Sequence, residues 1–168
     1  MSILTKNEIF KEIKKGNIKI MPFDRSAVGP GSVDLTLDNQ FRIFIKGKTL
    51  DVNENSDYQK ISRLIKKDSI VLKPGELIMA ITKEKITLSE NLCGWLEGRS
   101  RFARLGLLVH ITAGFMQPGI DNQQVLEIAN LSQRPLRLHA GIKICQFIFQ
   151  KTKGKAKYEG RFVKQKEV

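Results

Sequence analysis

The stretch EGRSRFARLG, residues 97–106, places charged residues between apolar segments, and any fold of this 168-residue chain must account for them. It carries three arginines and one serine between glycines, and apolar runs flank it: NLCGWL (91–96) before and LLVHITAGFM (107–116) after. Apolar runs of this kind usually belong to a buried core, where an unpaired guanidinium is costly. Two interpretations explain the arginines equally well, an anionic ligand or a structural arginine network between subunits.

Outward from this segment, the apolar pattern has a period of two. Short strands are predicted at SVDLTL (32–37), QFRIFI (40–45), SIVLK (69–73), ELIMAIT (76–82), VLEIAN (125–130), LRL (136–138) and IKICQFIF (142–149). Turn signals separate them, among them LDN (37–39), KPGE (73–76) and QPG (117–119). Many short strands at regular spacing favour a mainly β, jelly-roll-like barrel over βαβ units.

The two ends of the chain depart from this pattern. Residues 3–16 predict a short helix, because Thr5 and Glu8 have capping-box spacing and Gly16 can end the helix in the left-handed region. Residues 53–68 form a polar excursion with room for one helical turn, and residues 151–168 form a basic tail. We expect a single domain over residues 1–168.

Composition narrows the class of ligand. The net charge of +12 favours an anionic partner, although the lysine-rich pieces could equally be a solvated surface. The aromatic residues are scattered, which argues against a base-stacking platform and makes a nucleic-acid partner unlikely. We expect a cytoplasmic protein with no membrane span, since no run approaches about 18 apolar residues. Cys93 and Cys145 lie in apolar runs and predict buried free thiols.

Several catalytic motifs are missing from the sequence. A zinc nucleobase deaminase needs an H-x-E triplet and a P-C-x-x-C pair, and neither occurs here. P-loop, Rossmann and G-x-S-x-G patterns are also absent. We therefore predict no zinc and no other metal ligand among the side chains.

One acidic residue stands out within the predicted strand VLEIAN. Glu127 shares a face with Val125, whereas Leu126 and Ile128 lie on the other. Burial among apolar neighbours would raise its pKa toward a value suited to proton transfer, and an ordinary outward-facing strand residue is the alternative. Gly94, Gly98 and Gly106 are expected to let the backbone turn and approach a ligand. If residues 99–101 are extended, Ser100 lies opposite its two arginine neighbours.

The segment GRSRFARLGLLVHITAGFMQPGIDNQQVLEIAN (98–130) resembles the core of the metal-independent dCTP deaminases, relatives of the trimeric dUTPases. The family pattern is G-R-S-S-x-A-R-x-G, then T-A, D-P-G and V-L-E-x-x-N. The likeness extends to KIMPFDRSAVGPGSVDLTLDNQFRIF (19–44), LKPGELIMAIT and GIKICQFIF. It implies a distorted antiparallel β-barrel of the dUTPase type that forms a homotrimer, with active sites between subunits. The arginines would then face a nucleotide across an interface.

The resemblance also implies roles for individual residues. Glu127 would be the general base in hydrolytic deamination of dCTP to dUTP and ammonia, with Ser100 and Arg104 positioning the water and the pyrimidine. Arg99 would contact phosphate, Mg²⁺ would accompany the triphosphate, and the tail would close as a lid. The predicted substrate-binding residues are Arg99, Arg101, Thr112, Ala113, Gln117, Gln146, Lys157, Tyr158 and Arg161.

Three positions depart from the family pattern and keep alternatives open. Gln117 replaces the aspartate expected to contact the sugar, which speaks against diphosphohydrolase chemistry; a register using Asp121 would restore it but break the spacing to VLEIAN. Arg101 replaces the second serine, and Arg161 replaces a tail glutamine. The alternatives are a dUTPase, a bifunctional enzyme that releases dUMP, or a non-catalytic regulator that binds nucleotide or nucleic acid. The ligand is dCTP, with dUTP and dTTP as alternatives.

Overall fold

The computed structural model describes residues 2–163 and 165–168. Its helical segments are α1 (Lys6–Lys14), α2 (Ser100–Ala103) and the 3₁₀ turns η1 (Arg25–Ala27) and η2 (Tyr58–Ile61). Its strands are β1 (Ile18–Met21), β2 (Val33–Phe44), β3 (Ser62–Lys66), β4 (Ser69–Leu72), β5 (Leu77–Leu88), β6 (Leu92–Gly98), β7 (Leu107–Val109), β8 (Phe115–Met116), β9 (Asp121–Asn130), β10 (Leu136–His139) and β11 (Lys143–Lys151). The predicted mainly β class is confirmed.

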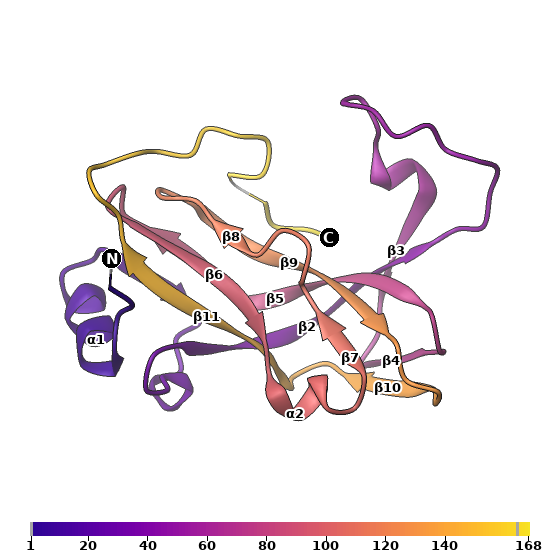
Figure 1. Cartoon of the computed structure of the whole chain (residues 1–168), viewed down its shortest axis with the longest axis horizontal. Coiled ribbons are helices and arrows are strands. Elements are labelled where there is room, and N and C mark those ends of the chain that lie inside the picture. Colours follow the sequence, from indigo (N-terminus) through magenta and orange to yellow (C-terminus); the bar gives the residue numbers. More distant parts are fainter. Residues whose placement is uncertain (1, 164) are drawn as a thin grey trace.

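The described strands form one large curled antiparallel sheet and one small one. The large sheet has nine strands in the order β7–β9–β5–β2–β11–β6–β8, with β1 pairing to β5 and β3 to β2. β4 pairs with β10 in the second sheet. The long strands curve around a common interior, while α1 lies at one side and the C-terminal segment crosses the opposite end from α2 (Figure 1).

Strict alternation of buried and half-buried residues builds the core. On β9, Leu126 and Ile128 are fully buried, whereas Val125 and Glu127 are not. Phe147 and Phe149 on β11 add a ring pair with centroids 4.5 Å apart. Each such buried side chain contributes about 1.5–3 kcal/mol. This energy fixes the register of β9, so Glu127 is held on the outer face, as the alternation predicts.

The predicted turn at 37–39 is wrong. β2 runs through it as one strand, and its pairing with β5 shifts register between Leu37 and Phe41. Between the pairs Leu37–Thr82 and Phe41–Ala80, β2 advances four residues and β5 two, so the irregularity absorbs two extra residues while both flanking segments stay paired. Leu37 and Phe41 are both fully buried, and burying them favours a continuous strand over a turn.

The N-terminal helix forms, but without its predicted capping box. Thr5 is the N-cap residue, yet its side chain makes no capping hydrogen bond. Glu8 instead accepts a hydrogen bond from Lys11 at 2.6 Å. Gly16 has φ +77°, as predicted for the helix end. The helical turn expected in residues 53–68 is η2, and β3, which the sequence pattern missed, follows it directly.

Two further expectations concern the chain as a whole. Cys93 and Cys145 are buried free thiols, as predicted. Within the described ranges, no helix is long and apolar enough to cross a membrane.

Candidate active site

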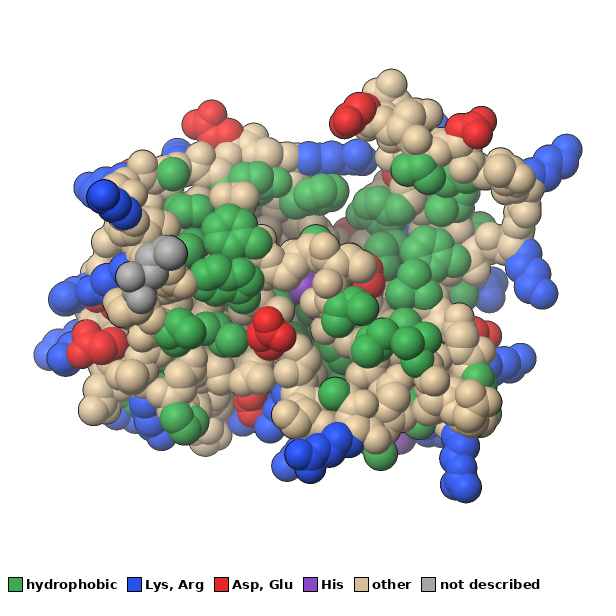
Figure 2. Space-filling view, viewed as in Figure 1, with side chains coloured by type: hydrophobic (Ala, Val, Ile, Leu, Met, Phe, Trp, Pro, Cys, Tyr) green, Lys and Arg blue, Asp and Glu red, His purple; other side chains and the backbone are tan. Residues whose placement is uncertain are grey.

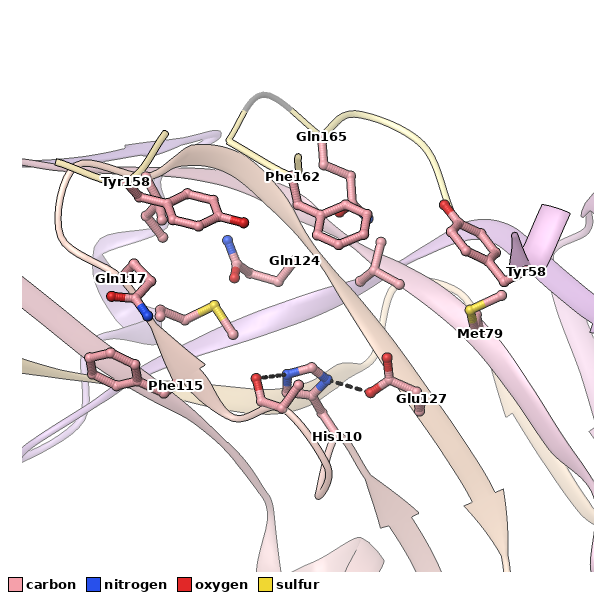
Figure 3. A pocket seen from close by; sticks show the side chains of 14 residues that line it. Tyr58, Met79, His110, Phe115, Gln117, Gln124, Glu127, Tyr158, Phe162 and Gln165 are labelled. Carbon is pink, nitrogen blue, oxygen red and sulfur yellow. Dashed lines mark hydrogen bonds and ion pairs between the residues drawn. The ribbon is translucent and has the colours of Figure 1, made fainter. Parts of the chain in front are cut away.

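A pocket of about 420 Å³ opens over the outer face of β9. Its floor and side walls come from β5, β9 and the connections between β7 and β8 and between β8 and β9. The lining there includes Met79, His110, Ala113, Gln117, Gln124 and Glu127. The C-terminal segment supplies Tyr158, Phe162 and Gln165 from the other side (Figure 3). This face of the molecule is hollowed between groups of hydrophobic side chains (Figure 2).

Glu127 lies at one side of this pocket with two side chains bound to the same oxygen. His110 Nδ1 is 2.8 Å from Glu127 Oε2, and the Thr112 hydroxyl donates to that oxygen at 3.3 Å. The Glu127 side chain is 32% exposed and lines the pocket, so part of it is accessible to a small molecule there. Of the predicted site residues, Ala113, Gln117 and Glu127 line this pocket within a single chain, and Thr112 contacts Glu127 without lining the pocket.

His110 is buried, and both of its ring nitrogens face oxygen acceptors. Nε2 lies 3.1 Å from the carbonyl oxygen of Ala113. Apart from the contact with Glu127, Nδ1 has no hydrogen-bond partner among the described residues. A neutral imidazole carries a proton on only one nitrogen, so a neutral His110 ring can donate to only one of these two oxygens. The backbone of His110 has φ 52°, a left-handed conformation that is uncommon outside glycine.

The expected rise in the pKa of Glu127 is wrong. Burial does act to raise the pKa, but the hydrogen bond and positive charge of His110, aided by the Thr112 hydroxyl, outweigh it. The net effect lowers the pKa of Glu127 below its ordinary value. The carboxylate is thus ionised near neutral pH and can accept a proton.

A second group of predicted residues gathers where β6 ends and α2 begins. Arg99 pairs with Asp34 at 2.9 Å and donates to the carbonyl of Lys143 at 2.7 Å. Gln146 donates to the carbonyl of Gly98 at 3.1 Å and accepts from the Ser32 hydroxyl at 2.8 Å. These contacts hold the end of β6, which leads into α2, against β2 and β11.

Residues 100–103 form a helical turn, so the extended backbone that would place Ser100 opposite Arg99 and Arg101 does not occur. Ser100, Arg101 and Arg104 are all exposed on this turn and its end. Of the three glycines expected to turn the chain, only Gly106 has positive φ, +80°. Gly94 lies inside β6, where an added Cβ would clash with Phe147, so its role is close packing.

The structure therefore separates the predicted site residues into two groups. The residues Ser100, Arg99, Arg101, Arg104 and Gln146 do not line the Glu127 pocket. α2 lies at the end of the molecule opposite the C-terminal segment that covers that pocket (Figure 1). Lys157 packs beside Gly119 near the pocket, while Arg161 contacts the ring of Phe162 and does not line it.

The structure supports the register that uses Gln117. Gln117 lines the pocket, whereas the Asp121 carboxylate binds Lys85 at 2.8 Å and Thr87 at 2.5 Å. Asp121 is thus committed to β5 and is not among the residues that line the pocket. The described residues also contain no cluster of three or more His, Cys, Asp or Glu side chains that could hold a metal ion.

Ten of the residues that line the pocket were not predicted, among them Tyr58, His110, Phe162 and Gln165. His110 lies in the segment 98–130 that carries the family motifs, two residues before Thr112. Its position directly after an apolar strand is the sequence feature that could have indicated a role in the site. Tyr58 comes from the polar excursion at residues 53–68, and Phe162 and Gln165 come from the tail. Nothing in their local sequence indicates that these segments meet β9.

Comparison with known proteins identifies the family. The model of the dCTP deaminase-like family matches residues 3–152. A Nocardioides protein named dCTP deaminase, dUMP-forming, is 34% identical over 170 residues, which covers 95% of this chain and 89% of that protein. A protein of the same name from Beutenbergia cavernae is 39% identical over 150 residues, covering 88% and 78%.

Solved structures share the fold. The 2'-deoxycytidine 5'-triphosphate deaminase from Agrobacterium tumefaciens matches 89% of this chain with a TM-score of 0.70 at 17% identity. The match covers 48% of that protein, so this chain spans about half its length. A dUTPase from phage phi11 of S. aureus matches 86% of this chain and 96% of its own, with a TM-score of 0.54 at 12% identity. The family match over residues 3–152 and the identity to these relatives show that the chain belongs to the dCTP deaminase-like family.

Proposed function

We propose that this protein hydrolyses the 4-amino group of dCTP, converting dCTP and water to dUTP and ammonia. The observation that carries the proposal is the half-buried Glu127 carboxylate beside His110 and Thr112 at a pocket of about 420 Å³. Membership of the dCTP deaminase-like family supplies the substrate class.

In the proposed mechanism, Glu127 is the general base. Its ionised carboxylate takes a proton from a water molecule, and the resulting hydroxide attacks C4 of cytosine. Glu127 passes this proton to N3, then takes the proton of the new C4 hydroxyl and passes it to the leaving amine. The C4–N bond breaks, ammonia departs and the carbonyl of uracil forms. His110 keeps the carboxylate ionised before the attack and holds it in place during the transfers.

Ser100 and Arg104 would reach this carboxylate from a neighbouring subunit. Within one chain they lie outside the Glu127 pocket, yet they are exposed and available to a partner. We propose a homotrimer in which each site combines the Glu127 group of one chain with the α2 group of the next. Arg99 and Arg101 would then contact phosphate, with guanidinium groups matching phosphate oxygens. Residues 1–168 would form one domain, and residues 151–168 its lid.

Mg²⁺ would enter with the nucleotide. The described side chains provide no cage for a resident ion, so triphosphate oxygens would hold it and no protein residue is assigned to it. When bound, Mg²⁺ neutralises phosphate charge. The proton transfers above use only Glu127.

A second activity, hydrolysis of dUTP to dUMP and diphosphate, is favoured by the names of the relatives, which are dUMP-forming enzymes. Gln117 lacks the carboxylate that would orient the second water, and this departure weighs against the step. The two activities differ in their product, so one assay separates them.

The test is ion-exchange analysis of the products from dCTP and from dUTP, with and without Mg²⁺. We expect ammonia with dUTP, dUMP or both from dCTP, and no ammonia from Glu127→Gln, which keeps the shape but cannot take a proton. Unchanged turnover in Glu127→Gln would remove this residue from the mechanism. Absence of turnover in the wild type, together with salt-dependent binding of nucleic acid, would favour the regulator instead.

A further inference from the structure

The C-terminal segment covers an otherwise open edge of β9. β7 pairs only with Ile128–Asn130, which leaves the first half of β9 without a strand on that side. There, the backbone N–H of Asp121 donates to the carbonyl of Val163 at 3.2 Å, and that of Gln123 to Gln165 at 3.0 Å. The segment thus continues the hydrogen bonding of the sheet along residues 121–123.

The segment ends in a separate apolar site on the barrel wall. Val168 is fully buried against Met79 and Ile81, and Phe44, Tyr58 and Val125 pack around them. A valine at the end of an irregular segment has no intrinsic reason to be buried, and burying it costs conformational entropy. Its complete burial therefore indicates a shaped site rather than a loose contact.

A buried arginine holds the backbone of the same residue. Arg42 is 8% exposed, and its Nε donates to the carbonyl oxygen of Val168 at 2.8 Å. The guanidinium also lies 5.5 Å from the Tyr58 ring centroid and 3.5 Å from the Ser62 hydroxyl. Among the described residues, no Asp or Glu side chain pairs with Arg42. A buried guanidinium needs acceptors, so without Val168 its Nε would lose the partner that the structure gives it.

The anchor site and the pocket share walls. Tyr58, Met79 and Val125 pack at the anchor site and also line the Glu127 pocket. Tyr158, Phe162 and Gln165 lie between Val168 and the start of the segment, and they form the roof above His110 and Glu127 (Figure 3). Holding Val168 in place therefore holds the roof in place.

We propose that the site formed by Arg42, Tyr58, Met79 and Ile81 is a docking site for the chain's own C-terminal segment, and that Val168 is its anchor. Arg42 acts as a positioning residue: through Val168, it keeps the roof over the pocket before any nucleotide arrives. The significance of the roof for catalysis rests on the proposed function. The docking itself does not.

Hydrogen exchange of the nucleotide-free full chain, measured with residue resolution, tests the docking. Val168→Lys places a charge in the apolar site beside Arg42, and Arg42→Met removes the donor while keeping an unbranched stem. In both variants we expect the amides of Asp121 and Gln123 to exchange at least about tenfold faster. Val52→Lys is the matched control, since Val52 is 86% exposed, and it should leave these amides unchanged. The Val168 change lies outside every strand, so it remains informative if Arg42→Met fails to fold.

Unchanged protection of Asp121 and Gln123 in Val168→Lys would overturn the docking site, whatever the outcome of the deamination assay. For the roof, we expect Val168→Lys to raise the KM for dCTP more than it lowers kcat, since Glu127 and His110 keep their contacts. Faster exchange with an unchanged KM would overturn the role of the roof in substrate binding. A chain that binds and deaminates nothing would contradict the proposed function but would leave the exchange result readable.

Discussion

His110 determines the chemistry of the carboxylate beside it. The alternation of VLEIAN predicts the face on which Glu127 lies, and the structure confirms that face. Its acidity could not be predicted, because it depends on a residue 17 positions earlier that the β7–β9 pairing brings within 2.8 Å. Burial alone would raise the pKa of Glu127, and the neighbouring imidazole reverses the direction of the shift.

Replacing this imidazole should shift the pH dependence of the reaction. His110→Asn removes the positive charge, and asparagine tolerates the left-handed backbone at this position. Burial then dominates and the pKa of Glu127 rises, so the base is protonated at higher pH. We expect the acid limb of the kcat/KM profile to move to higher pH. His139→Asn, at an exposed histidine, is the control; an unmoved limb in His110→Asn would show that the pair does not set the acidity.

The exposed residues of α2 give a second prediction at this scale. If Ser100 and Arg104 position the water and the pyrimidine in the assembled site, Ser100→Ala and Arg104→Ala each lower kcat/KM for dCTP by about 10²-fold or more. Steady-state ammonia release measures the effect. Arg63→Ala, at another exposed arginine, should have no effect. A loss below tenfold in both α2 variants would mean that these residues are not in the site.

At the scale of elements, the sequence pattern located most strands in which apolar residues alternate. It missed β1, although Ile18 and Ile20 are buried there and Lys19 between them is exposed, and it missed strands that lack the pattern. SVDLTL and QFRIFI were predicted as two strands, but they form the single strand β2. The sequence pattern could not show this, because it does not reveal that Leu37 and Phe41 are both buried on either side of a bulge. β6 carries three consecutive buried residues, Leu92 to Gly94, because both of its faces are covered there. Continuous burial erases the period of two, so such a strand has no alternating signal.

Docking of α1 gives a prediction at this scale. The Glu12 side chain is 2% exposed, accepts from Asn17 at 2.6 Å and lies 3.3 Å from Lys151 of β11. The Asn17 hydrogen bond lowers the pKa of Glu12, burial opposes this and Lys151 adds to the lowering. Because the folded-state pKa is the lower one, the resulting stabilisation is complete above about pH 4.5 and is lost as the pH falls through the folded value.

Glu12→Gln should therefore destabilise the protein at neutral pH by about 1–3 kcal/mol. Such a loss lowers Tm by about 2–4 °C per kcal/mol in a chain of this size. The difference in Tm between variant and wild type should shrink as the pH falls below 4.5, the ordinary value for this group. Thermal melts at several pH values measure it. Glu8→Gln on the exposed side of α1 is the control, and an equal loss in both would contradict the docking role of Glu12.

At the scale of the whole molecule, the outward position of the turn between β6 and β7 explains how segment 97–106 can carry three arginines between apolar flanks. Its arginines are not buried in the core of their own chain: Arg101 and Arg104 are exposed, and Arg99 is paired with Asp34. The apolar flanks belong to β6 and β7, which are buried, while the turn between them projects outward. A projecting cationic turn and an anionic pocket on one chain are complementary in charge, and the proposed symmetric assembly would join them.

Mixing two inactive variants tests this arrangement directly. Glu127→Gln lacks the base but keeps an intact α2 group, whereas Arg104→Ala lacks the α2 arginine but keeps the base. In trimers reassembled from equal amounts of both, roughly one quarter of the sites draw each group from an intact chain, if every site spans two subunits. Ammonia release should therefore recover to about that fraction of the wild-type rate. If both groups belonged to one chain, no mixture could contain an intact site, and the mixed sample would stay as inactive as its components.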